Sequence, residues 1–441
     1  MRTFDELNLG SSLRRAVDDA GFLHPTSIQL EVFSKVRSGK DIVGIAQTGT
    51  GKTMAYLMPL LKDFKFSKDN NARIMIVVPT RELVIQVVEE AKVLAEYLTV
   101  RIQGVYGGAN INTQKMDLLQ GVDIVVGTPG RLMDLGLDGS IKMNAIKKLV
   151  IDEVDEMLNL GFRTQLKNLM DLLPPRRQNL MFSATLTEDV DLLIHDFFID
   201  PVKVEVAIHG TPLERIDQKA YEVANYYTKA NLLLKLLEDE ALKKVLVFVS
   251  SKKMADRLFE KLGETYKEGG IGVIHSNKSQ NYRFRMVNEF AEGVHRVLIA
   301  TDIIARGLDI QEVSHVINFD CPETTSDYMH RIGRTGRAEA DGISISFFRE
   351  GEREFVDALE GLMKKKLNFI DFPEDVVKID ALLEEEKEVF KMKNYLPKHS
   401  LKNSKGAFHQ KLAKNTKVNR AQERRKARMN EKKKAKRKKK R

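Results

Sequence analysis

The chain has 441 residues, of which 42% are hydrophobic and 30% charged, so it can bury the cores of two or three domains and is not a wholly disordered protein. Its longest apolar runs have five residues against the ~20 of a membrane span, and we expect no signal peptide at its start. A single cysteine, Cys321, excludes an intramolecular disulfide. The net charge of +10 is unevenly spread, because residues 391–441 hold 22 Lys and Arg against 2 acids, whereas residues 1–390 hold 50 against 60. Such a basic tail predicts an anchor for a polyanion, most often nucleic acid.

Short apolar runs rich in β-branched residues alternate along the chain with longer stretches of helical period, which is typical of parallel α/β sheets. The runs form two sets, Asp41–Ala46, Ile74–Val78, Asp123–Val126, Lys148–Ile151 and Asn179–Ser183, then Val245–Val249, Ile271–His275, Arg296–Ala300, His315–Phe319 and Gly342–Phe348. Ten strands are too many for one ordinary sheet, and a polar segment with Gly210 and Pro212 separates the two sets. We therefore predict an α/β domain at 1–206, a linker at 207–214, a second α/β domain at 215–375, and a basic, largely disordered tail at 376–441.

The first predicted strand runs into a glycine-containing turn, Gln47–Thr53, that opens a helical stretch. A strand, a glycine turn and a helix in this order are the setting of a phosphate-binding loop, whose backbone N–H groups wrap a polyphosphate at the helix N-terminus. Lys52 is expected to reach the β- and γ-phosphates, and the Thr53 hydroxyl to ligate Mg²⁺. The usual first glycine of such loops is Ala46 here.

Two carboxylates, Asp152 and Glu153, follow the predicted strand Lys148–Ile151 directly. Because ligands bind at the carboxyl ends of parallel strands, we expect Asp152 to hold Mg²⁺ through its waters and Glu153 to deprotonate the attacking water. The base of the nucleotide is predicted from a third residue, Gln29, because a side-chain amide can read the N6/N7 edge of adenine.

With these residues in place, the sequence resembles the DEAD-box RNA helicases of superfamily two, and in particular short bacterial members with a basic C-terminal tail. The resemblance covers about residues 1–370 and rests on many motifs in the right order, including Gly21–Gln29, Ala46–Thr53, Pro79–Leu83, Thr128–Arg131, Asp152–Asp155, Ser183–Thr185, Gln280–Arg283, Thr301–Asp309 and His330–Arg337. The family also has alanine at the position of Ala46. One departure is Val154, where the family usually has alanine, and we expect its larger side chain to affect coupling rather than the reaction.

The resemblance implies two tandem RecA-like domains, ATP and Mg²⁺ as cofactors, and an ATP hydrolase that is stimulated by RNA. It implies catalytic roles for Lys52, Asp152, Glu153 and two arginine fingers, Arg334 and Arg337. Nucleotide contacts are implied for Phe4, Phe22, Gln29, Thr48, Gly49, Thr50, Gly51, Lys52, Thr53 and Asp309, with Thr53 and Asp152 at the metal. RNA contacts are implied for Arg81, Gly108, Thr128, Arg131, Ser251, Arg283 and Thr301, and coupling between the domains for Asp155, Ser183, Thr185 and His330.

The implied RNA groups are hydroxyl, backbone and arginine groups, which suit phosphate and sugar rather than base edges, so we expect binding without sequence preference. The favoured function is an ATP-dependent RNA helicase whose domains close on ATP and RNA and locally unwind duplexes or remodel RNA–protein complexes. A non-unwinding, ATP-dependent RNA clamp carries the same motifs and stays open as an alternative, and a DNA-directed helicase is the less favoured one. We expect a cytoplasmic location, although the basic run at 432–441 is also typical of a nuclear address.

Overall fold

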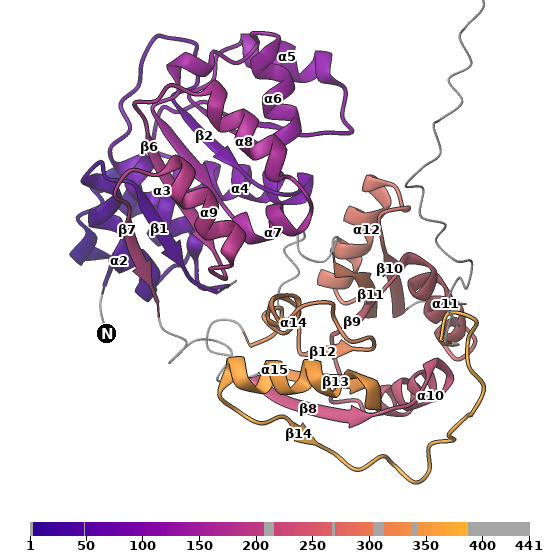
Figure 1. The fold of residues 1–441 in the computed structure, drawn as a ribbon. Coiled ribbons are helices and arrows are strands. Elements are labelled where there is room, and N and C mark those ends of the chain that lie inside the picture. The colour runs from indigo at the N-terminus through magenta and orange to yellow at the C-terminus, as the bar shows by residue number, and fades with distance from the viewer. Residues whose placement is uncertain are drawn as a thin grey trace, which may run out of the picture. The chain divides into compact units, whose positions relative to one another are not determined.

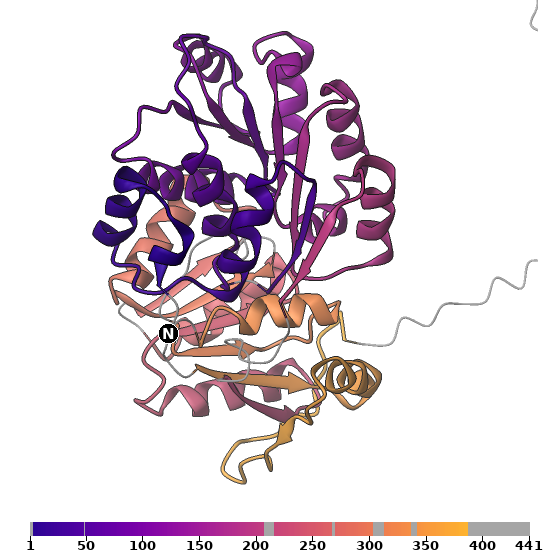
Figure 2. The ribbon, with the colours of Figure 1, turned by 90° about the vertical axis from the view of Figure 1, so that its left-hand side faces the viewer.

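The computed structural model describes residues 3–47, 49–206, 216–266, 270–302, 313–336 and 342–386. Two seven-stranded sheets, each covered by helices, account for almost all of them (Figures 1 and 2). Both sheets belong to one compact unit, Met1–Lys387. The predicted linker and the tail from residue 387 onward lie outside the described residues, and the predicted domain boundaries stay predictions.

The first sheet has the strand order β3-β4-β2-β5-β6-β1-β7, and all of its neighbouring strands are parallel. Its strands are β1 (Ile42–Ile45), β2 (Ile74–Val77), β3 (Ile102–Val105), β4 (Ile124–Gly127), β5 (Lys148–Ile151), β6 (Gln178–Ser183) and β7 (Val202–Glu205). The central strands are buried on both faces because their side chains alternate between two cores. In β2, for example, Ile74 and Ile76 enter one core and Met75 and Val77 the other.

Helices cover both faces of this sheet. One core holds side chains from α1 (Ser11–Asp19), α2 (Ser27–Arg37), α3 (Lys52–Lys62) and α4 (Arg81–Leu94). The opposite core holds side chains from α5 (Ile111–Leu119), α6 (Pro129–Leu137), α7 (Val154–Asn159), α8 (Arg163–Leu172) and α9 (Glu188–Phe197). Val154 is fully buried in this second core, so the departure from alanine is accommodated by apolar packing.

The second sheet repeats the plan with the order β10-β11-β9-β12-β13-β8-β14, again with parallel neighbours. Its strands are β8 (Ile216–Glu222), β9 (Val245–Val249), β10 (Gly270–Ile274), β11 (His295–Thr301), β12 (His315–Asn318), β13 (Gly342–Phe348) and β14 (Asn368–Phe369). Its helices are α10 (Tyr226–Leu237), α11 (Lys252–Gly263), α12 (Gln280–Ala291), α14 (Thr325–Ile332) and α15 (Arg353–Met363). The predicted fold of two tandem parallel-sheet domains is confirmed.

The segment after β14 stays attached to the second sheet. Val376 and Leu383 are buried in its core, and the backbone of Ile379 exchanges hydrogen bonds with the side chain of Thr228, at 3.0 and 3.3 Å. Residues up to 386 therefore pack on this sheet, ten residues beyond the predicted start of the tail at 376.

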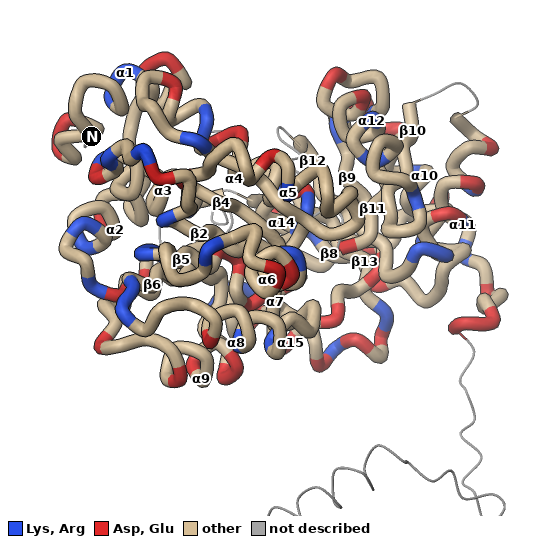
Figure 3. Tube along the Cα trace, turned by 90° about the horizontal axis from the view of Figure 1, so that it is seen from above, with Lys and Arg blue, Asp and Glu red and all other residues tan. Residues whose placement is uncertain are grey.

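Acidic and basic positions are interspersed along the described chain in the Cα trace of Figure 3. None of the described helices combines the length and apolar character that a membrane crossing requires.

Candidate active site

A cavity of about 610 Å³ lies at the carboxyl end of the first sheet, where ligands bind in open parallel α/β folds. It is lined by the turn before α3 and the first residues of α3, by α4, by the two residues that follow β5, and by Arg334, which follows α14 of the second sheet. Eight residues predicted to bind nucleotide, metal or γ-phosphate line it: Phe22, Gly49, Gly51, Lys52, Thr53, Asp152, Glu153 and Arg334. The structure thus gathers into one cavity side chains that lie up to 312 residues apart (334 − 22).

The turn before α3 has the backbone of a phosphate loop. Gly49 and Gly51 have φ values of 81° and 83°, which side-chain-bearing residues rarely adopt. A Cβ at Gly51 would also collide with the amide of Gln29, so glycine is required there on two grounds. The Thr50 hydroxyl donates to the Gln47 carbonyl at 2.7 Å and fixes the turn. Lys52 begins α3 and is buried, yet its Nζ has no hydrogen-bond partner among the described residues. A buried ammonium without an acceptor is poorly satisfied, and a phosphate oxygen would satisfy it.

Two carboxylates with different environments face this loop from the end of β5. Asp152 is buried; its Oδ2 accepts from the Tyr56 hydroxyl at 3.0 Å and its Oδ1 from the Glu153 backbone N–H at 3.0 Å. Glu153 has φ 51° and ψ 50°, a strained conformation for a non-glycine residue. Burial raises the pKa of Glu153 to about 7, although the positive charges of Lys52 and Arg334 oppose the rise. A carboxyl with this pKa is suited to accept a proton near neutral pH.

Asp155, in the first turn of α7, connects the carboxylates after β5 to the segment that follows β6. Its Oδ2 accepts from the Thr185 N–H and hydroxyl, both at 2.9 Å, and from the Ala184 N–H at 3.2 Å. Burial alone would raise the pKa of Asp155, but the nearby charges of His330 and Lys52 and these hydrogen bonds lower it. Ser183 instead donates to the Thr185 carbonyl at 2.7 Å. The predicted coupling residues Asp155, Ser183, Thr185 and His330 are therefore close neighbours.

Two residues of the predicted base site lie elsewhere. The Gln29 amide is buried and already engaged, because Oε1 accepts from the Thr26 N–H at 2.9 Å and Nε2 donates to the Gly51 carbonyl at 3.2 Å. Phe4 is buried in the hydrophobic core of the first sheet. Neither residue lines the cavity, whereas Phe22 does and is 43% exposed. Gln29 thus contacts the phosphate loop itself, and its reading of adenine stays a prediction.

The seven predicted RNA-contacting residues all lie at or after the carboxyl ends of strands. Gly108 follows β3, Thr128 and Arg131 follow β4, Arg81 follows β2, Ser251 follows β9, Arg283 follows β10, and Thr301 ends β11. Thr128 and Ser251 are the N-cap residues of α6 and α11, so their hydroxyls lie beside helix N-termini that favour anions. Arg131 donates to Gln114 at 2.6 Å and to the Ala109 carbonyl at 3.0 Å, which holds its guanidinium in place.

Arg81 and Arg283 form contacts between the two domains. Arg81 donates to Gln280 Oε1 at 3.1 Å, and Arg283 pairs with Glu82 at 2.5 Å, with both members of the pair at most 7% exposed. The partner of Arg283, Glu82, was not predicted as a site residue, although it lies beside Arg81 in the same motif. Tyr56 was not predicted either, although its position four residues after Lys52 puts both on one face of α3.

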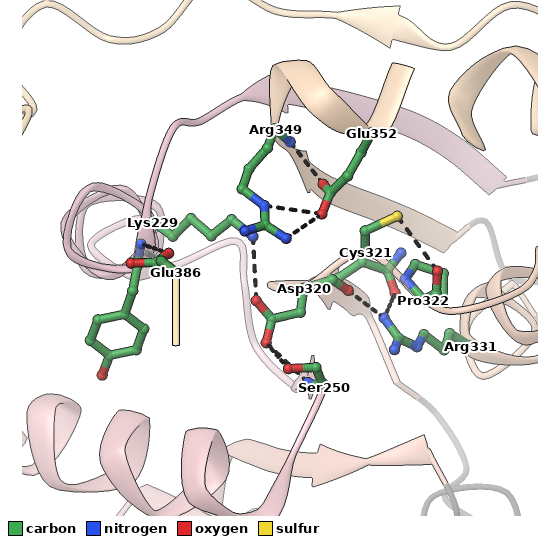
Figure 4. A network of polar contacts seen from close by, with 11 residues as sticks. Lys229, Ser250, Asp320, Cys321, Pro322, Arg331, Arg349, Glu352 and Glu386 are labelled. Carbon is green, nitrogen blue, oxygen red and sulfur yellow. Dashed lines mark hydrogen bonds and ion pairs between the residues drawn. The ribbon is translucent and has the colours of Figure 1, made fainter. Parts of the chain in front are cut away.

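A polar network lies at the carboxyl ends of the central strands β9 and β12 of the second sheet (Figure 4). Arg331 donates to both carboxylate oxygens of Asp302 at 2.6 and 2.8 Å and to the Asp320 carbonyl at 2.6 Å. The Asp320 carboxylate pairs with Lys229 and accepts from Ser250 next to Ser251. This network fixes the turn from which Arg334 reaches the cavity. Thr48, Asp309 and Arg337 lie outside the described residues.

Comparisons with known proteins agree with this geometry. The family model described as "DEAD/DEAH box helicase" matches residues 26–193, and "Helicase conserved C-terminal domain" matches 228–339. The chain is 37% identical over 402 residues to the RNA helicase CrhR of Synechocystis, spanning 90% of this chain and 81% of that protein. It is 36% identical over 414 residues to the DEAD-box ATP-dependent RNA helicase CshA of Bacillus cereus, spanning 94% and 77%.

Among solved structures, Saccharomyces cerevisiae Dbp5 bound to RNA and ADP BeF3 superposes with a TM-score of 0.76 at 27% identity, covering 84% of this chain and 96% of that one. The cavity with its phosphate loop and paired carboxylates, the two parallel sheets and these relatives agree: the chain belongs to the DEAD-box family of ATP-dependent RNA helicases.

Proposed function

We propose that this protein hydrolyses ATP in the large cavity, that RNA stimulates the hydrolysis, and that closure of the two domains locally unwinds RNA duplexes or remodels RNA–protein complexes. The observation that carries the proposal is the presence of Arg334, from the second domain, in one cavity with Lys52 and Glu153 of the first. A catalytic set divided between two domains is complete only when they meet, so whatever favours closure favours hydrolysis.

The residues present fit a magnesium nucleotide. The buried Nζ of Lys52, which lacks an acceptor among the described residues, suits the β- and γ-phosphates, and the backbone at Gly49 and Gly51 suits their close approach. Thr53 and Asp152 would hold Mg²⁺, since a hydroxyl and a carboxylate are ligands this ion accepts directly or through water. Bound there, the ion would neutralise charge on the phosphate oxygens.

The protein's own groups account for the rest of the chemistry. Glu153 takes a proton from the attacking water while the water oxygen bonds to the γ-phosphorus. The bond between that phosphorus and the bridging oxygen of the β-phosphate breaks, which gives ADP and inorganic phosphate. Arg334, an arginine finger, stabilises the charge on the transferring group with its guanidinium fork. Arg337 is proposed as a second finger. Asp155, Ser183, Thr185 and His330 would transmit the arrangement of the second domain to the carboxylates.

RNA would lie across the carboxyl ends of both sheets, where Arg81, Gly108, Thr128, Arg131, Ser251, Arg283 and Thr301 are found. Helix N-termini and arginines bind phosphate and sugar without reading bases, which supports binding without sequence preference. A strand bent by closure cannot remain in a regular duplex, so strand separation follows. The basic tail is proposed as an additional, flexible RNA anchor, and the cytoplasm as the place of action.

The test is ATP hydrolysis measured without nucleic acid, with RNA and with DNA of matched sequence, together with release of a labelled strand from a short RNA duplex. We expect stimulation by RNA only, and strand release that requires turnover. Arg334→Ala should lower hydrolysis by ~10³-fold or more while nucleotide binding persists. RNA-dependent hydrolysis without strand release would favour the clamp, and equal stimulation by DNA would contradict the assignment to RNA.

A further inference from the structure

A second cavity, of about 220 Å³, lies at the opposite, amino end of the first sheet. It is bordered by the first residues of β2 and β5 and by the last turn of α3 and the residues that follow it. α3 has 11 residues, which at ~1.5 Å per residue separates its two ends by ~16 Å. Since Lys52 begins this helix, the second cavity is a separate place from the active site.

The cavity has an apolar floor and a basic rim. Leu60 and Ile74 are buried and Phe64 is half-buried. Lys65, Arg73, Lys147 and Lys148 supply four positive charges, and the single acid in the lining, Asp63, is already paired with Arg37 at 2.9 Å. Within the lining itself, four positive charges therefore face one acid that already has a partner.

Arg73 is incompletely satisfied. Its Nη2 donates to the Lys65 carbonyl at 2.6 Å, and it pairs with Asp123 at the long distance of 3.6 Å. Asp123 is fully buried and accepts from Arg101 through both carboxylate oxygens, at 2.9 and 3.1 Å, so most of its charge is taken by another guanidinium. The Nε of Arg73 is buried and has no hydrogen-bond partner in the described part of the chain. A buried donor of this kind normally has an acceptor.

Lys148 has the same deficit. It is half-buried at the start of β5, and burial lowers the pKa of its ammonium, with only partial compensation from Asp63. Within the residues that the structure describes, the Lys148 ammonium has no ion-pair or hydrogen-bond partner. An anion beside it would offset the desolvation of the charge.

We propose that this second cavity binds an organic anion with a phosphate or carboxylate head against Arg73 and Lys148 and an apolar body on Leu60, Phe64 and Ile74. The proposal is independent of the helicase function. The partial negative charge at the carboxyl end of α3 attracts cations by itself and accounts for lysines near it. This helix charge does not account for the Nε of Arg73, which is buried without an acceptor among the described residues.

The anion can be a free small molecule or an acidic side chain next to an aromatic one on a partner polypeptide. The probes are phenyl phosphate for the first source and the tripeptide acetyl-Glu-Phe-Glu-amide for the second, with inorganic phosphate as the probe that lacks an apolar body. Binding is measured by calorimetry on the full chain carrying Lys52→Ala, which removes the phosphate contact of the active site.

We expect phenyl phosphate or the tripeptide to bind, and whichever binds more tightly identifies the source. Lys148→Met keeps the apolar stem and should weaken binding by ~10-fold, the effect of ~1.4 kcal/mol, whereas Lys167→Met on the exposed face of α8 should leave it unchanged. Inorganic phosphate should bind more weakly than phenyl phosphate. Should Lys148→Met fail to fold, Lys147→Ser, at an exposed position of the rim, should weaken binding by a few-fold.

Three results would overturn the proposal: no binding of either organic anion, equal binding by the Lys148→Met and Lys167→Met proteins, or inorganic phosphate binding as tightly as phenyl phosphate.

Discussion

Replacing Glu153 with glutamine should affect both catalysis and stability, because this half-buried carboxyl is the proposed base and its desolvation shifts its pKa. The amide keeps the shape of the side chain but cannot accept the proton of the attacking water. Loss of a positioned base costs ~10²–10⁴-fold in rate, so turnover should fall by that factor while binding of nucleotide and RNA persists. The same substitution removes a partly desolvated charge, and the structure predicts what that does to stability.

The magnitude follows from the pKa of Glu153. Burial raises it from 4.5 to about 7 in the folded protein, which corresponds to about 3 kcal/mol. The folded state holds the proton more tightly than the unfolded state, so the wild-type protein loses this stability as pH rises from about 4.5 to about 7. Below that window the carboxyl is protonated in both states and the two proteins should be equally stable. Above it, Glu153→Gln should be more stable than the wild type by up to about 3 kcal/mol.

The assay is denaturant unfolding of the nucleotide-free protein at pH 4, below this window, and at pH 8, above it, with steady-state ATP hydrolysis at pH 8 on the same preparations. Glu205→Gln, on the exposed edge strand β7, is the matched control and should change neither quantity. Equal stability of Glu153→Gln and wild type at pH 8 would refute the argument from burial. Wild-type turnover in the variant would refute the assignment of the base.

The other predictions concern binding and coupling. Glu82→Gln leaves the buried guanidinium of Arg283 without its counter-charge, so RNA-stimulated hydrolysis should fall while ATP hydrolysis without RNA is unaffected; unchanged stimulation would mean that the pair does not support closure. Gln29→Ala removes the hydrogen bond to Gly51 and should weaken binding of a fluorescent ADP by several-fold, and an unaltered affinity would exclude that role. Truncation after Leu396 removes 20 Lys and Arg and 2 acids, which leaves 52 basic against 60 acidic residues. The slope of log affinity for RNA against log salt concentration should become shallower by ~0.7 for each RNA phosphate that the tail neutralises. Parallel salt series for the two proteins would exclude the tail as an RNA anchor.

The sequence predicts the centres of both sheets better than their edges. All ten apolar runs form strands, because a strand buried on both faces must be apolar throughout. The strands that were not predicted are β3, β7, β8 and β14. β7 reads Val-Lys-Val-Glu and has one solvated face, β3 contains a glycine and a glutamine, and β14 has two residues. Such strands lack a local apolar signal, and their pairing is decided by the neighbouring strand.

At the active site, too, residues with a local sequence signal could be predicted and residues defined by distant partners could not. That Lys52, Asp152 and Glu153 lie together in one cavity could be predicted, because each lies in a short stretch whose glycines or strand context are visible locally, whereas their catalytic roles stay predictions. Tyr56 and Glu82 could not, since their partners Asp152 and Arg283 are 96 and 201 residues away (152 − 56 and 283 − 82). No local pattern says which acid or hydroxyl a folded chain will place beside a distant charge.

The division of the site between two domains also affects the protonation of Glu153, the proposed base. Burial raises the pKa of Glu153, and the positive charge of Arg334 lowers it. Withdrawal of Arg334 would leave the carboxyl more fully protonated at neutral pH and unable to accept a proton. Approach of the same guanidinium both completes the set of groups around the γ-phosphate and favours the ionised base. Under the proposed mechanism, closure therefore assembles the site and activates it through one charge, which is a physical reason for hydrolysis to wait for RNA.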